Sequence, residues 1–120
     1  MVLLNSDTQV APGWLAALRA LVHATADVGT ATPLSNDATL ASYPHAGGGN
    51  RPPSPAAFRR LAALAARVNH GVAVEIPTAV GFCMYIRREC LDEVGPLRED
   101  LFAQGYGEEN DFCLRARHLG

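Results

Sequence analysis

An unbroken aliphatic run near the amino terminus constrains this fold more than any other feature of the sequence. Val2–Leu4 lacks the polar alternation of a half-buried strand, and the run stops at Asn5-Ser6-Asp7. A strand of this kind is typical of a parallel sheet that helices cover on both faces. The sequence therefore predicts an α/β fold with a polar turn at the end of a buried strand.

Alternating helical and β-rich segments extend this prediction along the chain. Behind Pro12, one predicted helix face carries Trp14, Leu18, Leu21 and Val22, and β-rich segments follow. The predicted helices cover residues 12–27, 55–68, 88–94 and the last residues of the chain. Further β-rich segments are predicted at 28–32, at 72–76 before Pro77, and at 82–86. The strand–helix–strand order of the first 32 residues indicates a right-handed crossover.

A long polar segment separates the first two predicted helices. Residues 35–54 are rich in Ser, Asn, Gly and Pro, which build turns and irregular loops. A loop of this length inside a compact domain is usually functional or mobile. Ser54 as N-cap and Pro55 as first helical residue predict the start of the second helix, with Phe58, Leu61, Ala65 and Val68 on one face.

Charge and cysteine content exclude several classes of protein. The net charge is −2, with ten basic and twelve acidic residues interspersed, so we expect no attraction to nucleic acid or to an anionic membrane surface. Cys83, Cys90 and Cys113 form no CxxC pair, which indicates reduced thiols packed in the core of a cytoplasmic protein. No apolar run reaches the ~20 residues that span a bilayer, and the start of the chain does not resemble a signal peptide.

The polar turn at Asn5-Ser6-Asp7 has two interpretations. Asn and Asp at a strand end commonly form Asx-turns, which is a purely structural role. Alternatively, a carboxylate at the carboxyl end of a strand lies where open α/β sheets bind ligands and can hold a divalent cation. Asp7 would then be the metal ligand.

An acidic cluster near the carboxyl end also has two interpretations. Glu108, Glu109 and Asp111 follow Gly105-Tyr106-Gly107. They could be the solvated start of a helix, whose dipole favours negative charge. If the segment folds into a cleft, repulsion and desolvation would favour protonation of one carboxylate, making Glu109 or Glu108 a general base.

Gly81 and the histidines give weaker signals. Gly81 could mark a bulge in a strand or let the backbone approach a ligand closely. The four histidines lie far apart and show no ligand spacing, so a zinc site built from them and the cysteines is not expected. No nucleotide-binding loop or hydrolase motif occurs.

Four blocks in a fixed order resemble the family 2 glycosyltransferases of the GT-A fold. They read VLLNSDT, PGWL, PTAVGFCMYIRRECLDEVGPL and LFAQGYGEENDFCLRA, and they cover nearly all of the chain. The resemblance is to the carboxyl-terminal half of the catalytic domain, particularly of bacterial enzymes that build rhamnose-containing cell-surface polysaccharides. It implies that residues 1–120 form one partial Rossmann-like domain of the nucleotide-diphospho-sugar transferase type, with helices packed on a mixed, mainly parallel sheet.

The resemblance also assigns roles to residues of these blocks. In such enzymes the last Asp of a DxD-like motif binds Mg²⁺ or Mn²⁺ on the diphosphate of a nucleotide-sugar, and that role falls on Asp7. The family's acidic motif maps onto Glu108, Glu109 and Asp111, which places the acceptor-activating base at Glu109. The other matched residues are Asn5, Ser6, Ala79, Val80, Gly81 and Phe82 for the donor, and Gly105, Tyr106 and Gly107 in the acceptor-side loop.

The implied reaction is transfer of a hexosyl or deoxyhexosyl group with inversion. The donor would be a UDP-, dTDP- or GDP-sugar, and the acceptor a saccharide or a lipid-linked saccharide. A metal on the diphosphate stabilises the leaving nucleotide, while a carboxylate takes the proton of the attacking hydroxyl. No covalent intermediate is required, so no separate nucleophile is needed.

By the same resemblance, the strands that hold the nucleotide base and ribose are absent. We therefore expect the chain alone to be inactive, as part of a larger enzyme in the cytoplasm or at the inner face of the plasma membrane. Any membrane contact would involve the absent regions. The alternatives are a non-catalytic carbohydrate-binding module and a metal-assisted hydrolase that uses the same carboxylates.

Overall fold

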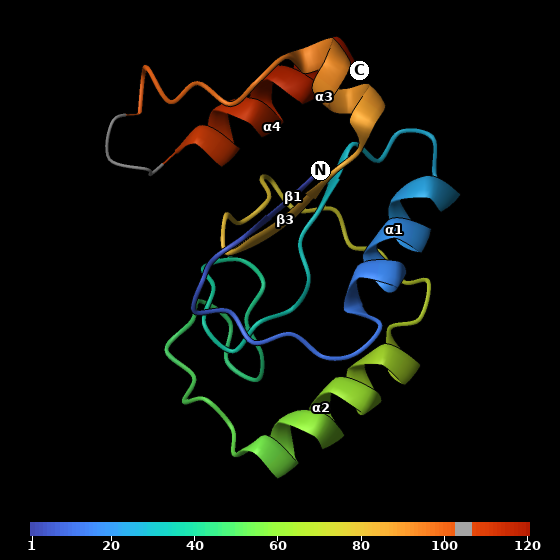
Figure 1. The fold of residues 1–120 in the computed structure, drawn as a ribbon, viewed down its shortest axis with the longest axis vertical. Helices are drawn as coiled ribbons and strands as arrows, with labels where there is room; N and C mark the ends of the chain where they lie inside the picture. The colour runs from blue at the N-terminus through green and yellow to red at the C-terminus, as the bar shows by residue number, and fades with distance from the viewer. Residues whose placement is uncertain (103–106) are drawn as a thin grey trace.

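The computed structural model describes residues 1–102 and 107–120, and it confirms the α/β class (Figure 1). Helices and strands fall where the sequence patterns place them, within a few residues, except that the β-rich segment 72–76 forms no strand. In chain order they are β1 (Val2–Leu4), α1 (Trp14–Ala24), β2 (Thr30–Ala31), α2 (Pro55–Val68), β3 (Cys83–Ile86), α3 (Arg88–Val94) and α4 (Glu108–Leu119).

The sheet corrects the predicted strand directions. The described strands form one sheet of order β1-β3-β2, and β3 is antiparallel to both neighbours. For these strands the prediction of a mainly parallel sheet is wrong, because an aliphatic run shows that a strand is covered but not which way its neighbour runs. β1 and β2 do share one direction, so α1 connects two like-oriented strands with β3 between them.

Burial is concentrated in β3 rather than in β1. Cys83, Met84 and Ile86 are buried, whereas Leu4 at the end of β1 is 43% exposed. Hydrogen bonds between Met1 and Ile86 extend the pairing by one residue, with N···O distances of 2.7 and 2.9 Å. Among the described strands β1 has a partner on one side only, which explains why its side chains are less covered than the sequence predicted.

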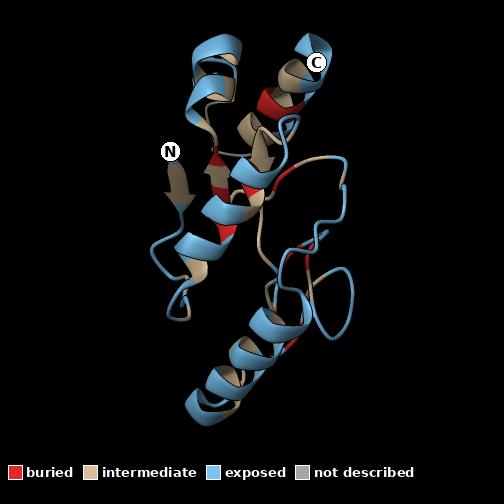
Figure 2. Cartoon of the chain, turned by 90° about the vertical axis from the view of Figure 1, so that its right-hand side faces the viewer, coloured by how far each residue is buried: buried red, intermediate tan, exposed pale blue. Residues whose placement is uncertain are grey.

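The core lies where α3 and α4 pack against β3 (Figure 2). Phe112 and Cys113 of α4 contact Met84 and Ile86 of β3, and Ala79 joins the same cluster. Burial of a side chain as large as Phe112 contributes about 1.5–3 kcal/mol to folding. The cluster is completed by Leu3, Cys90, Leu91, Val94 and Leu97, which are partly buried.

Helix α1 covers the sheet through the face that the sequence predicted. Leu18 and Val22 are buried, and Trp14 and Leu21 are partly covered. The helix ends at Ala24, before the predicted end near Asp27, because Thr25 has an extended conformation.

The three cysteines are free thiols, as predicted. Cys83 and Cys113 are buried, and Cys90 is half-buried. Cys90 packs closely against the segment that enters β2: a Cβ built on Gly29 would lie 2.7 Å from the Cys90 Sγ. The absence of a side chain at position 29 therefore allows α3 to approach this segment.

Helix α2 begins as predicted but packs less than predicted. The Ser54 hydroxyl accepts a hydrogen bond from the amide of Ala57, Pro55 is the first helical residue, and Asn69 caps the end. No residue of α2 is buried, and of the four predicted apolar-face residues only Phe58 and Ala65 are even partly covered. Capping and spacing predicted the helix, but they do not show what its face packs against.

The predicted loop 35–54 contains no helix or extended strand, and internal hydrogen bonds organise it. The buried Asn50 side chain accepts from the His45 amide at 3.1 Å and donates to the His45 carbonyl at 2.8 Å. The Asp37 carboxylate accepts from the Gly49 amide at 2.6 Å. Polar side chains thus replace apolar packing in setting this loop's conformation.

Candidate functional site

The turn after β1 rests on the segment that leads into β3. The Asn5 amide donates to the Phe82 carbonyl at 2.9 Å, and the Thr8 hydroxyl donates to the same oxygen at 3.4 Å. The Thr8 amide closes the turn on the Asn5 carbonyl at 3.1 Å. The backbone and Thr8 therefore build this turn, and they leave the Asp7 carboxylate exposed at its tip.

Thr8 is a structural member of the site that the sequence interpretation missed. Its position directly after Asn5-Ser6-Asp7 was the available signal, since a Thr hydroxyl beside an Asx-rich turn commonly bonds nearby backbone.

The segment 78–82 is fixed from two sides. The Val80 amide donates to the Thr32 hydroxyl, just past β2, at 3.0 Å. The Ala79 amide donates to Cys113 Sγ in α4 at 3.3 Å. Because both anchors hold backbone groups, the path of residues 78–82 between the turn and α4 does not depend on their own side chains.

Gly81 and Glu109 lie against each other at the centre of the site. A Cβ built on Gly81 would be 3.7 Å from both Cδ and Oε1 of Glu109, which is an ordinary van der Waals contact. The Thr78 hydroxyl approaches the Glu109 carbonyl at 3.5 Å on the same side. Of the two glutamates that the sequence left open, Glu109 is therefore shown beside the predicted donor-binding segment.

Asp111 has a packing role that the sequence interpretation did not foresee. Arg115 Nε lies 2.8 Å from one carboxylate oxygen, and Arg98 lies 3.7 Å from the other. Arg115 also donates to the carbonyls of Val94 and Pro96 at 2.7 and 2.9 Å. These contacts fasten α4 to the end of α3, and the i,i+4 spacing of Asp111 and Arg115 was the signal for them.

The remaining predicted residues are placed as follows. Glu108 is partly exposed in the first turn of α4, and Gly107 precedes the helix with a φ of 107°, a conformation that glycine adopts readily. Gly105 and Tyr106 lie outside the described residues. The predicted acceptor-side loop is thus described only at its last residue.

The residues at the turn could bind a cation whose other ligands are phosphate oxygens, but they could not hold a metal ion with protein ligands alone. Within residues 1–102 and 107–120, no group of three or more His, Cys, Asp or Glu could hold a metal ion. Mg²⁺ is commonly held by one or two carboxylates together with substrate phosphates and water. A single exposed carboxylate such as Asp7 fits that mode of binding.

Cys83 and Cys90 are weak candidates for a nucleophile. Burial raises the pKa of the Cys83 thiol, and burial is also the main cause of the raised pKa of Cys90. A thiol with a raised pKa stays protonated at neutral pH and is a weak nucleophile. We therefore assign neither of these two thiols a role in the candidate site.

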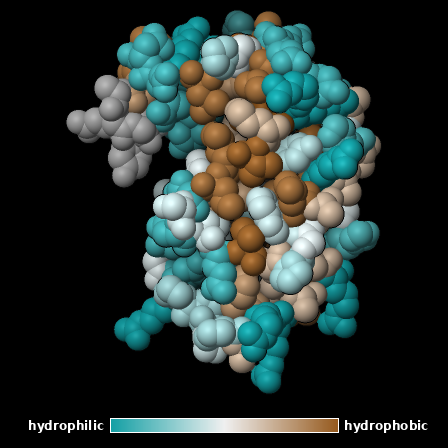
Figure 3. Space-filling model, viewed as in Figure 1, coloured by the Kyte–Doolittle hydropathy of each residue, from teal (hydrophilic) through white to brown (hydrophobic). Residues whose placement is uncertain are grey.

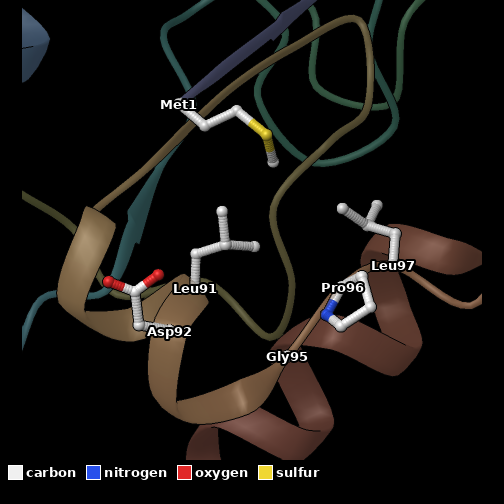
Figure 4. Close-up of a pocket in the computed structure, with 6 residues that line it drawn as sticks. All are labelled: Met1, Leu91, Asp92, Gly95, Pro96 and Leu97. Atoms are coloured by element: carbon white, nitrogen blue, oxygen red, sulfur yellow. The ribbon is translucent and has the colours of Figure 1, made fainter.

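A separate hollow lies at the start of β1. It has a volume of about 460 Å³ and is lined by Met1, Leu91, Asp92, Gly95, Pro96 and Leu97 (Figure 4). Its walls are apolar apart from Asp92, whereas ligand sites usually contain several converging polar groups. We therefore place the candidate site at the turn and α4, not in this hollow.

Comparisons of the chain with protein-family profiles, curated proteins and solved structures returned no match. Across the described part of the chain, no helix has the length and apolar character needed to cross a bilayer.

Proposed function

We propose that this chain is the acceptor-side half of an inverting, metal-dependent glycosyltransferase of family 2. The observation that carries the proposal is the meeting of three segments far apart in sequence. The turn containing Asp7, the segment containing Gly81 and the first turn of α4 containing Glu109 are joined through Phe82 and Gly81. These are the segments to which the sequence resemblance assigns metal, donor and base.

The edge of the sheet supports the partial-domain aspect of the proposal. No described strand pairs with the outer side of β1, and an unpaired strand edge is ready to accept another strand. Figure 3 shows apolar side chains gathered in a band down one face of the molecule. At the two ends of the β1 segment, Met1 and Leu4 are exposed by 39% and 43%. Nucleotide-binding strands added at this edge would cover both, and strands parallel to β1 would give the mixed sheet of the GT-A fold.

In the proposed mechanism, Glu109 is the general base. Its carboxylate takes the proton from the acceptor hydroxyl as the hydroxyl oxygen bonds to the anomeric carbon. The bond from that carbon to the nucleoside diphosphate breaks on the opposite face, so the anomeric configuration is inverted. Asp111, held by Arg115, keeps the start of α4 in place.

Asp7 has the complementary role at the donor. It would bind Mg²⁺ or Mn²⁺ together with the diphosphate, and the cation would offset the negative charge of the leaving nucleotide. Because Asn5 replaces a second carboxylate, most of the remaining ligands must come from the diphosphate and water.

Calorimetric titration with UDP and dTDP, with and without Mn²⁺, tests the proposal. We expect binding that requires Mn²⁺ and weakens at least ten-fold in Asp7→Ala, since a direct ligand to the metal is lost. Asp27→Ala removes another exposed carboxylate and serves as the matched control. Nucleotide binding that does not depend on Mn²⁺, or that is equal in Asp7→Ala, would contradict the assigned role of Asp7, whereas a folded chain that binds neither nucleotide would place the nucleotide pocket in the absent strands.

Titration with saccharides separates the proposal from a carbohydrate-binding module. Such a module would bind saccharide equally well with and without Mn²⁺, and the Glu109→Gln variant would bind it as well as the parent chain does. Loss of acceptor binding in Glu109→Gln, with Glu108→Gln unaffected, would support Glu109 as the group that contacts the acceptor hydroxyl.

A further inference from the structure

The charges of this chain are segregated, although its net charge is small. Residues 38–74, here called the basic arm, contain Arg51, Arg59, Arg60 and Arg67 and no acidic residue. All twelve acidic residues and the other six basic ones lie outside this arm. The expectation of no attraction to an anionic membrane surface rested on the small net charge and on charges interspersed along the chain, and the acid-free basic arm corrects the second of these premises.

The arginines of the basic arm are not engaged in the described ion pairs. The salt bridges between described residues involve Arg87, Arg88, Arg98, Arg115 and Arg117, all outside the arm. Arg51, Arg59, Arg60 and Arg67 are exposed. Their charge is therefore presented to the surroundings of the protein.

Helix α2 adds an apolar surface to this positive charge. It lies at the end of the molecule away from α3 and α4 and is exposed along most of its length (Figure 2). Leu61, Leu64 and Val68 are exposed by 42%, 45% and 62%. At helical spacing these three residues share one stripe, and Arg60 and Arg67 border it on the side away from the partly covered Phe58 and Ala65.

We propose that α2 is an amphipathic helix that lies on an anionic membrane surface. Leu61, Leu64 and Val68 enter the boundary between headgroups and acyl chains, as in interfacial helices with a basic border. The arginines bury their aliphatic stems beside this stripe and keep their guanidinium groups at the lipid phosphates. Val72 and Val74, in the segment that follows the helix, are also exposed, by 57% and 79%.

The charge pattern favours a lipid surface over a second copy of the chain. If two α2 helices packed against each other, their arginines would face a partner without a carboxylate, and like charges at an interface oppose association. An anionic bilayer supplies both the negative charge and the apolar depth that the helix requires. This inference depends only on the basic arm and is independent of the proposed enzymatic function.

Sedimentation with vesicles tests the inference on the whole chain. We expect binding to phosphatidylglycerol-containing vesicles that high salt weakens, and little binding to phosphatidylcholine alone. Each basic residue near such a surface contributes roughly a five-fold factor, so Arg60→Gln combined with Arg67→Gln should lower the partition coefficient about 25-fold. Leu61→Ser with Leu64→Ser should lower it at least ten-fold through lost apolar burial.

Helix α1 provides the matched control. Leu15→Ser with Arg19→Gln removes an exposed leucine and an exposed arginine from a helix outside the basic arm, and we expect unchanged vesicle binding. Circular dichroism confirms that each variant keeps its helices. Three results would overturn the inference: equal binding to neutral and anionic vesicles, α2 variants that bind like the parent chain, and binding to an acidic polypeptide but not to vesicles.

Discussion

Helices α2 and α4 begin at well-defined boundaries but have different relations to the rest of the molecule. Helix α4 places Phe112 and Cys113 in the core, and Arg115 fastens it to the end of α3. Helix α2 has a capping serine and a first-turn proline, yet it buries no residue. The difference shows that local signals determine where a helix begins, whereas a complementary surface determines whether its apolar face is buried.

We expect the largest difference in stability when one apolar residue is truncated in each helix. Phe112→Ala should lower the free energy of unfolding by about 3–5 kcal/mol, because it leaves a cavity in the core. Leu64→Ala, at an exposed position of α2, should change it by less than about 0.5 kcal/mol. Urea denaturation followed by circular dichroism measures both. Equal losses would show that α2 is packed as firmly as α4.

A sharper test concerns the polar attachment of α4. Arg115→Ala removes an ion pair and leaves the carbonyls of Val94 and Pro96 without this donor, so we expect a loss of about 2 kcal/mol. Arg117 is a suitable control because it lies in the same helix and is more exposed, at 47% against 19%. Arg117→Ala should cost less than about 1 kcal/mol. Thermal unfolding of both variants shows whether the loss of stability comes from the partly buried contacts of Arg115 or is the same for any arginine of α4.

The smallest expected effect is a loss of stability at alkaline pH. It arises from two thiols on the packed side of the molecule. Burial raises the pKa of Cys83 and Cys90 above 9.0, so the folded chain holds these protons more tightly than the unfolded chain. Their contribution is complete below the unfolded pKa and is lost as pH rises through the raised values. We therefore expect the free energy of unfolding to fall above about pH 9.

Cys83→Ala isolates this effect. The substitution changes overall stability through lost packing, but the relevant measurement is the slope of unfolding free energy against pH between about 8 and 10. The chain contains no lysine, so few other side chains titrate in this range. An unchanged slope in Cys83→Ala would contradict the assignment to this thiol.

Sequence patterns identified the elements better than their mutual arrangement. The strand at Cys83–Ile86, the N-cap at Ser54 and the buried face of α1 were readable because each depends on neighbouring residues. The antiparallel direction of β3 was not readable, since the aliphatic run at Val2–Leu4 is compatible with either direction.

The candidate site shows the same limit. Asn5-Ser6-Asp7 and Glu109 were selected from residue type and position, but the contact between Glu109 and Gly81 depends on how α4 docks against residues 78–82. Two residues that far apart in sequence carry no local signal of their contact. The pairing of Asp111 with Arg115 is different, because one turn of helix separates them and the spacing could have predicted it.

Because Gly29 lies close to Cys90, the side-chain sizes at these two positions constrain each other. A methyl group at position 29 would overlap the space of the Cys90 sulfur, so the two residues share one small volume. Neither position can enlarge unless the other shrinks or α3 moves away from the sheet. Among related chains we therefore expect positions 29 and 90 to covary in size, with alanine at 29 accompanied by a residue smaller than cysteine at 90.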